Sequence, residues 1–110
     1  MSERSIEEIK DTILSFAGNK NVNISKIVLF GSEAAGLANT ESDIDLMIVS
    51  KDFSEKSYTF RVNKLLGLNR KLVKLTNRAF DIIYYSDDEW EVSSSPMIAE
   101  AKVNGKILYC

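Results

Sequence analysis

Histidine is absent from this 110-residue chain, and its absence removes several kinds of chemistry. There can be no Ser-His-Asp or Cys-His nucleophile, no histidine general base and no histidine-liganded zinc. Cysteine occurs once, as Cys110, so neither an intrachain disulfide nor a cysteine-rich metal site can form. We expect Cys110 to be a free thiol in a reducing compartment, although it could form an intermolecular disulfide in air. Any metal ion must be held by carboxylates, carbonyl oxygens or water.

Long apolar runs and a basic excess are also missing. No run approaches the roughly 20 residues of a membrane span, and the charged first ten residues are unlike a signal peptide. We therefore expect a cytoplasmic protein without a membrane partner. The 14 Lys and Arg against 16 Asp and Glu give a net charge of −2. A nucleic-acid binder normally carries a basic excess, so the composition argues against such a partner.

The length and the apolar periodicity predict one α/β domain spanning residues 1–110. Strands are predicted over residues 24–30, 43–50 and 79–85, with a further short strand over 107–109. Helices are predicted over residues 6–18, 32–38, 55–76 and 96–105, with Ser54 as the N-cap of the third. Ser5 is the expected N-cap of the first helix, and Gly67 weakens the middle of the third. The expected architecture is a small mixed sheet with helices packed mainly on one face.

The most informative passage is a Gly-Ser pair separated by ten residues from an Asp-x-Asp. Gly31 and Ser32 follow an apolar run, and Asp43 and Asp45 open the next one. Glycine lets a phosphate approach the backbone without a Cβ in the way. Ser32 adds a hydroxyl donor and opens a helix-forming stretch, whose free N–H groups favour an anion. Two residues apart on a strand, Asp43 and Asp45 are expected to project from the same face.

Carboxylates held this close repel each other. At roughly 7 Å and an effective dielectric of about 20, the repulsion is about 2 kcal/mol. A fold does not normally hold such a pair together without a cation, and hard oxygen ligands around a triphosphate suit Mg²⁺. A third carboxylate, Asp81, interrupts an otherwise apolar strand, where a charge needs a partner. The alternative is that these carboxylates have a structural role. Asp81 would then form a salt bridge to a helix, and Asp43 and Asp45 would be neutralised by Arg61, Arg70 or Arg78.

In type and spacing, these residues resemble the motif of the nucleotidyltransferase superfamily of DNA polymerase beta. The resemblance is strongest to its minimal nucleotidyltransferase (MNT) branch, which has Gly-Ser, ten residues, Asp-x-Asp and a third Asp on a later strand. The matching residues are Gly31, Ser32, Asp43, Asp45 and Asp81. The resemblance spans nearly the whole chain and implies the nucleotidyltransferase fold.

The resemblance also implies an activity: Mg²⁺-dependent transfer of a nucleoside monophosphate, AMP from ATP, to an acceptor hydroxyl. The ATP phosphates would bind at Gly31 and Ser32. Asp43 and Asp45 would hold two Mg²⁺ ions, while Asp81 completes the second metal site and accepts the proton of the acceptor. Minimal members of the family often act as antitoxins that transfer AMP to a tyrosine hydroxyl of a HEPN-domain RNase toxin. Such a toxin is therefore the expected partner and acceptor.

One departure from the family pattern keeps other functions open. Ala35 stands where the family often has arginine, and Glu33 adds a negative charge beside the expected phosphate site. A second hypothesis is a non-catalytic antitoxin that neutralises a HEPN-type partner by occlusion. A third is a small-molecule nucleotidyltransferase, which would need more chain or a homo-oligomer to build its acceptor pocket. Retention of all three carboxylates favours the enzyme, whereas partner binding unaffected by Asp43→Asn would favour the scaffold.

Overall fold

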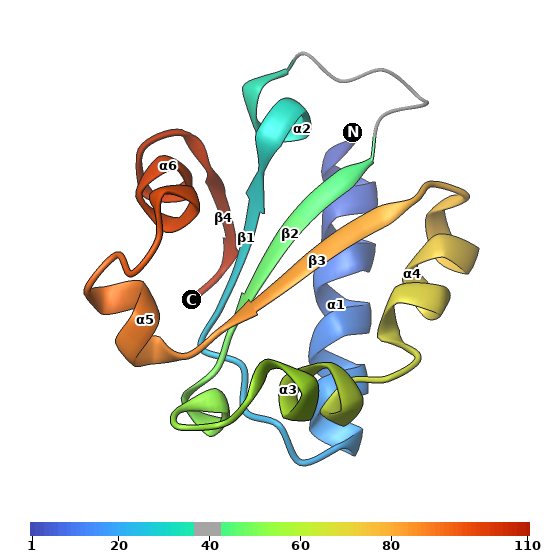
Figure 1. Cartoon of the computed structure of the whole chain (residues 1–110). Coiled ribbons are helices and arrows are strands. Elements are labelled where there is room, and N and C mark those ends of the chain that lie inside the picture. The colour runs from blue at the N-terminus through green and yellow to red at the C-terminus, as the bar shows by residue number, and fades with distance from the viewer. Residues whose placement is uncertain (37–42) are drawn as a thin grey trace.

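One four-stranded mixed sheet organises the computed structural model, which describes residues 1–36 and 43–110. The strands are β1 (Lys26–Phe30), β2 (Ile44–Val49), β3 (Phe80–Tyr85) and β4 (Lys106–Tyr109). They lie in the order β3-β2-β1-β4 (Figure 1). β1 runs antiparallel to both of its neighbours, whereas β2 and β3 are parallel. The mixed sheet predicted from the sequence is confirmed.

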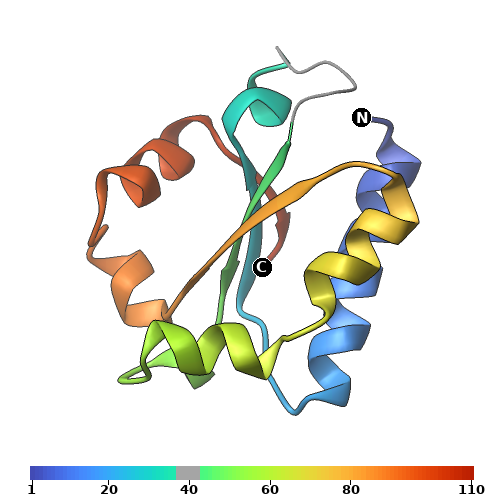
Figure 2. The same ribbon diagram turned by 45° about the vertical axis from the view of Figure 1, so that its right-hand side comes forward.

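The helices lie on both faces of this sheet, with the larger share on one. They are α1 (Glu3–Asn19), α2 (Gly31–Ala35), α3 (Tyr58–Lys64), α4 (Leu68–Thr76), α5 (Asp87–Glu91) and α6 (Pro96–Asn104), with a 3-10 turn η1 (Lys51–Phe53). α1 and α4 lie side by side on one face, and α5 and α6 lie on the other (Figures 1 and 2). α2 follows directly from the end of β1, so it sits at one end of the sheet.

Two apolar clusters follow from the alternation of side chains along β2. The larger cluster, which includes residues of α1 and α4, receives Ile44, Leu46 and Ile48. The smaller cluster, which includes residues of α5 and α6, receives Met47 and Val49. A central strand covered on both faces reads as a near-continuous apolar run. Asp45 is the exception in this run, and the period of two places it on the face of the smaller cluster.

The first helix begins earlier than the sequence pattern indicated. Ser2, and not Ser5, is the N-cap, because the Ser2 Oγ accepts a hydrogen bond from the Ser5 backbone N–H at 3.1 Å. The predicted N-cap was therefore wrong by three residues. Both serines are competent caps, and Ser2 gains one more turn of helix.

The long helix predicted over residues 55–76 is two helices, α3 and α4. The N-cap of α3 is Ser57, which accepts a hydrogen bond from the Phe60 backbone N–H, so the predicted Ser54 cap was wrong by three residues. Gly67 has φ +96°, a left-handed conformation that an α-helix does not contain, and it is the N-cap of α4. The break lets α3 contact β3 while α4 runs along α1 (Figure 2). Gly67, which the sequence indicated as a weak point of one long helix, therefore separates α3 from α4.

The strand expected to open at Asp43 begins one residue later, at Ile44. The end of the helix predicted over 32–38, at residues 37 and 38, and the loop that follows lie outside the described residues. Within the described part of the chain, no helix is both long and apolar enough to cross a membrane.

Candidate functional site

Three strands bring the motif residues to one end of the sheet. β1 ends at Phe30, immediately before Gly31, while β2 and β3 begin at this same end (Figure 1). Phe30 is paired with Asp45 across β1 and β2, and Asp45 is paired with Asp81 across β2 and β3. The turn at Gly31 and the carboxylates of Asp45 and Asp81 are therefore neighbours, although up to 50 positions of sequence separate them. We call this end of the sheet, with Gly31, Asp43, Asp45 and Asp81, the carboxylate corner.

Gly31 is required by two features of this corner. Its φ of +71° lies in the left-handed region that residues other than glycine rarely adopt. A Cβ at this position would also overlap the Oδ2 atom of Asp45 and would come within 3.2 Å of its Cγ. The missing side chain thus lets the Asp45 carboxylate lie directly against the turn that the sequence predicted to bind phosphate.

The carboxylates at this corner act on one another. Burial raises the pKa of Asp45 above its usual value, and the negative charges of Asp81 and Asp43 raise it further. Asp43 and Asp81 are themselves exposed, whereas Asp45 is half-buried. The corner therefore concentrates negative charge, open on one side to solvent and to a ligand.

In the described part of the chain, no ion pair offsets this charge. Among the ion pairs of residues 1–36 and 43–110, none includes Asp43, Asp45 or Asp81. The Arg61 guanidinium pairs with Glu89 at 2.6 Å, and Arg78 pairs with Glu33. Two of the three arginines that the structural alternative offered therefore form ion pairs with glutamates.

The donor chemistry of the corner fits a hard divalent cation. Within the described residues, no three His, Cys, Asp or Glu side chains converge closely enough to hold a metal ion by themselves. Mg²⁺, however, is usually bound through one or two carboxylates, with substrate phosphates and water supplying the remaining ligands. Asp45 and Asp81, paired across two strands beside an expected phosphate site, match that pattern.

Asp43 lies one residue before the start of β2. It is exposed, and its negative charge acts on Asp45. The pair that the sheet places face to face is Asp45 and Asp81. Local spacing cannot reveal this pairing, because it depends on β2 and β3 being parallel neighbours in this register. The side chain of Ser32 lies outside what the structure describes.

Glu33 does not present an uncompensated charge to the turn. Its carboxylate pairs with the Arg78 guanidinium and lies 3.7 Å from the α-amino group of Met1. Its side chain is only 6% exposed. The expectation of an added negative charge beside the phosphate site is therefore corrected. Sequence reasoning missed Arg78 as its partner, since no periodicity links a residue after β1 to one before β3.

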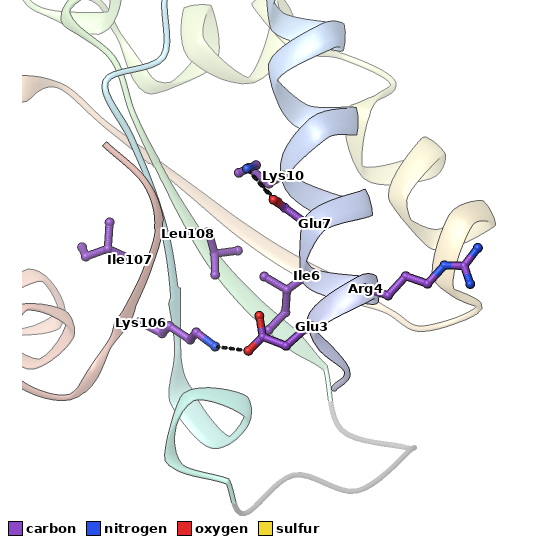
Figure 3. Close-up of a pocket in the computed structure, with 8 residues that line it drawn as sticks. All are labelled: Glu3, Arg4, Ile6, Glu7, Lys10, Lys106, Ile107 and Leu108. Carbon is purple, nitrogen blue, oxygen red and sulfur yellow. Dashed lines mark hydrogen bonds and ion pairs between the residues drawn. The ribbon is translucent and has the colours of Figure 1, made fainter.

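A separate cavity of about 480 Å³ opens between α1 and β4. Figure 3 shows its charged rim, where Lys106 lies 3.8 Å from Glu3 and Lys10 lies 2.6 Å from Glu7. β4 is the edge strand opposite β3, so this cavity lies away from Asp81. It is no part of the carboxylate corner.

Comparison with known proteins places the chain in a class. Residues 9–110 match the profile of the family described as polymerase beta, nucleotidyltransferase. The chain belongs to this family, and the family resemblance drawn from the sequence is confirmed. No curated protein matches the chain at a significant level.

Solved structures with the same fold agree with this assignment. A Sulfolobus solfataricus protein classed as a nucleotidyltransferase superposes with a TM-score of 0.61 at 18% identity, covering 94% of this chain and 78% of its own. A toxin–antitoxin structure with AMP-PNP gives 0.60 at 21% identity, covering 90% and 71%. A tri-AMPylated Shewanella oneidensis HEPN toxin in complex with its MNT antitoxin gives 0.54 at 18% identity, covering 94% and 71%. At these identities the likeness shows the fold, which confirms the predicted α/β nucleotidyltransferase architecture.

Proposed function

We propose that this protein transfers AMP from ATP to a tyrosine hydroxyl of a HEPN-domain toxin and so acts as its antitoxin. One observation carries the proposal: Asp45 lies against Gly31 and opposite Asp81, in a family of nucleotidyltransferases. A phosphate-sized ligand at the turn would thus lie beside two carboxylates. The structural neighbours, a toxin–antitoxin structure with AMP-PNP and an AMPylated HEPN toxin in complex with an MNT antitoxin, suggest the nucleotide and the acceptor.

The turn provides the nucleotide site in this proposal. Gly31 and Ser32 bind the triphosphate, and the missing Cβ at Gly31 allows the phosphates to approach the backbone. Three carboxylates placed beside a triphosphate would repel it, so they require cations between them. Asp43, Asp45 and Asp81 would hold two Mg²⁺ ions, which supply charge neutralisation and alignment of the attacking and leaving oxygens.

The chain's own residues then perform three tasks. Gly31 and Ser32 orient the α-phosphate toward the acceptor. Asp81, which is exposed, accepts the proton of the attacking tyrosine hydroxyl. The hydroxyl oxygen forms a bond to the α-phosphorus, the bond from that phosphorus to the bridging oxygen breaks, and pyrophosphate leaves. Positioning and electrostatic stabilisation account for most of the catalysis in such a transfer.

Label transfer tests the proposal. The purified protein is incubated with Mg²⁺ and ATP labelled at the α-phosphate, in extract from its own source in which the HEPN-type partner has been shown to be present. We expect a labelled protein band, absent when the label is at the γ-phosphate and absent for Asp43→Asn/Asp45→Asn. Asp11→Asn is the matched control, since Asp11 is an exposed aspartate on α1, outside the site.

The identity of the labelled species decides the acceptor. A labelled tyrosine on the HEPN-domain protein establishes the proposed reaction. A labelled small molecule or RNA keeps the nucleotidyltransferase and replaces the acceptor. Absence of any label that depends on the carboxylates refutes the enzyme.

A binding scaffold is the second candidate, favoured by Ala35 in place of the family's arginine and by the lack of a preformed three-carboxylate cluster in the described residues. In that case the protein would neutralise its HEPN-type partner by occlusion. The Asp43→Asn variant separates the two functions. The scaffold predicts full neutralisation by this variant, whereas the enzyme predicts its loss.

A further inference from the structure

An ion pair links the turn at Gly31 to the segment that leads into β3. Glu33 is the third residue of α2, two residues after Gly31, and Arg78 stands three residues before Asp81. Their side chains are 6% and 17% exposed, so solvent screens this pair less than it screens an exposed one. In the sheet, β2 lies between the strands that these two segments join. The pair therefore spans the end of β2 that carries Asp45.

Arg78 is attached to a well-supported part of the fold. Its backbone N–H donates to the Thr76 Oγ1 at 3.2 Å, and that hydroxyl donates to the Leu72 carbonyl of α4 at 2.9 Å. The next residue, Ala79, accepts a hydrogen bond from the Ile44 backbone N–H at 2.9 Å. The guanidinium thus extends from the junction of α4, β2 and β3. α2, by contrast, is a single five-residue helix and has little cooperative stability of its own.

Arg78 lies on the face of the sheet opposite the one on which the strand alternation places Asp45. Arg78 lines a cavity together with Ile44 and Thr76. Ile44 faces the larger core, whereas Asp45 faces the opposite side of the sheet. Both partners of the Glu33 carboxylate, Arg78 and the α-amino group of Met1, belong to residues that line this cavity, so the carboxylate is held toward the face opposite Asp45.

We propose that Arg78 is a positioning residue for the nucleotide-binding turn, acting through Glu33. The ion pair holds α2 against the junction of β2 and β3, and so fixes Gly31 relative to Asp45 and Asp81. The consequence for nucleotide binding rests on the proposed function, but the mechanical role does not. A small displacement of a bound group can cost a large part of the rate, so a fixed turn has functional value.

Hydrogen exchange of the free protein tests the mechanical role without nucleotide or metal. The variants are Glu33→Met and Arg78→Met, which each remove one partner, and Arg78→Lys, which keeps the charge. Glu7→Met is the control, because Glu7 forms an ion pair with Lys10 inside α1 and away from the turn. We expect exchange of the amides in residues 27–36 to rise roughly 3- to 30-fold in the two Met variants. In the two Met variants, the exchange rates of the α1 amides should match those of the parent. The exchange rates over residues 27–36 should match the parent in Glu7→Met and lie close to it in Arg78→Lys.

Nucleotide titration distinguishes positioning from simple electrostatics. Removing the negative charge of Glu33 would tighten binding of Mg-ATP if only its field mattered. Positioning predicts the reverse: Glu33→Met and Arg78→Met both weaken binding, by roughly 3- to 30-fold. Arg78→Lys restores most of the affinity.

The outcomes separate the two ideas. Unchanged exchange over 27–36 in a folded Glu33→Met, or tighter nucleotide binding by that variant, overturns the positioning role. If the parent binds no nucleotide, the proposed function fails, and the exchange comparison alone decides the positioning role. If a Met variant does not fold, the Arg78→Lys variant tests the positioning role instead. Amide exchange over residues 27–36 as fast in Arg78→Lys as in a Gly31→Ala protein would refute the idea that the ion pair holds the turn in place.

Discussion

Asp45 and Asp81 lie directly opposite each other on the parallel strands β2 and β3. Opposed like charges destabilise a sheet, and Asp45 is half-buried as well. The fold therefore carries an electrostatic cost at the place where the motif residues meet. Such a cost is typical of functional sites, which proteins maintain against their own stability.

Asp45→Asn should separate stability from activity. Removal of one charge relieves the repulsion, so we expect the free energy of unfolding at pH 7 to rise by about 0.2–1 kcal/mol, the scale of cross-strand pairs. Carboxylate-dependent label transfer should be lost. Urea unfolding and the label assay measure the two effects, with Asp11→Asn as the control. A destabilised Asp45→Asn would show that the charge is satisfied in the fold.

The difference in the free energy of unfolding between Asp45→Asn and the parent should depend on pH in a definite direction. Burial, with the charges of Asp81 and Asp43, holds the pKa of Asp45 above its value in the unfolded chain. As the pH falls through the raised pKa, the folded protein takes up a proton before the unfolded chain does, so this group increases stability on acidification. The advantage of Asp45→Asn over the parent should shrink as the pH falls from 7 toward 4. An advantage that stays constant over this range contradicts the raised pKa.

Gly31→Ala should disrupt the corner. The methyl group would overlap the Asp45 carboxylate, and alanine would be held at φ +71°. We expect a loss of about 1–3 kcal/mol of stability from the backbone conformation alone, together with loss of nucleotide binding. Gly36→Ala is the informative control, because its φ of +73° is similar and no atom lies within 4 Å of its added Cβ. If both variants bind nucleotide equally poorly, the contact with Asp45 is not the cause.

Glu89→Gln should weaken the fold without touching the site. Burial opposes ionisation of Glu89, but the Ser86 backbone N–H and the Arg61 guanidinium outweigh it and hold its pKa below the usual value. The substitution leaves the buried Arg61 without its counter-ion, so we expect a loss of about 1–3 kcal/mol at pH 7.

Since the pKa of Glu89 is lowered, its contribution is present above the unfolded pKa and is lost as the pH falls through the folded one. The difference in the free energy of unfolding between the parent and Glu89→Gln should therefore decrease at acidic pH. Urea unfolding at several pH values measures it, with the exposed Glu91→Gln as the control. Equal stability of parent and Glu89→Gln at pH 7 would show that solvent replaces the pair.

Gly67→Ala should be destabilising although there is room for the methyl group. The added Cβ would lie 3.5 Å from the Phe16 ring, an ordinary contact, but φ is +96°. We expect a loss of about 1–3 kcal/mol from the backbone. Gly18→Ala, inside α1 with open space around it, should instead gain about 0.5–1 kcal/mol. Thermal unfolding of the two variants should therefore shift in opposite directions, and a stabilised Gly67→Ala would contradict the helix break.

Much of the fold could be predicted from local pattern. The β strands were placed within one or two residues, because β2 and β3 are apolar runs and Gly31 and Gly105 follow turn and cap chemistry. The helix from Pro96 to Gly105 was also predicted, since proline suits the first turn. The Ser5 cap was wrong because Ser2 serves equally well. The single long helix was wrong because a glycine inside a helical pattern weakens the helix without showing whether the helix ends there.

The sequence by itself determined the residue types of the site, the Gly-Ser and Asp-x-Asp spacing and the order of the four strands along the chain. Only the tertiary structure decided that Asp45 faces Asp81, that its carboxylate lies against Gly31, and that Arg78 draws Glu33 to the opposite face of the sheet. The physical reason is that local preferences act over a few residues. Strand order, direction and register are set by burial of both faces of β2 at once, which depends on segments far apart in the chain.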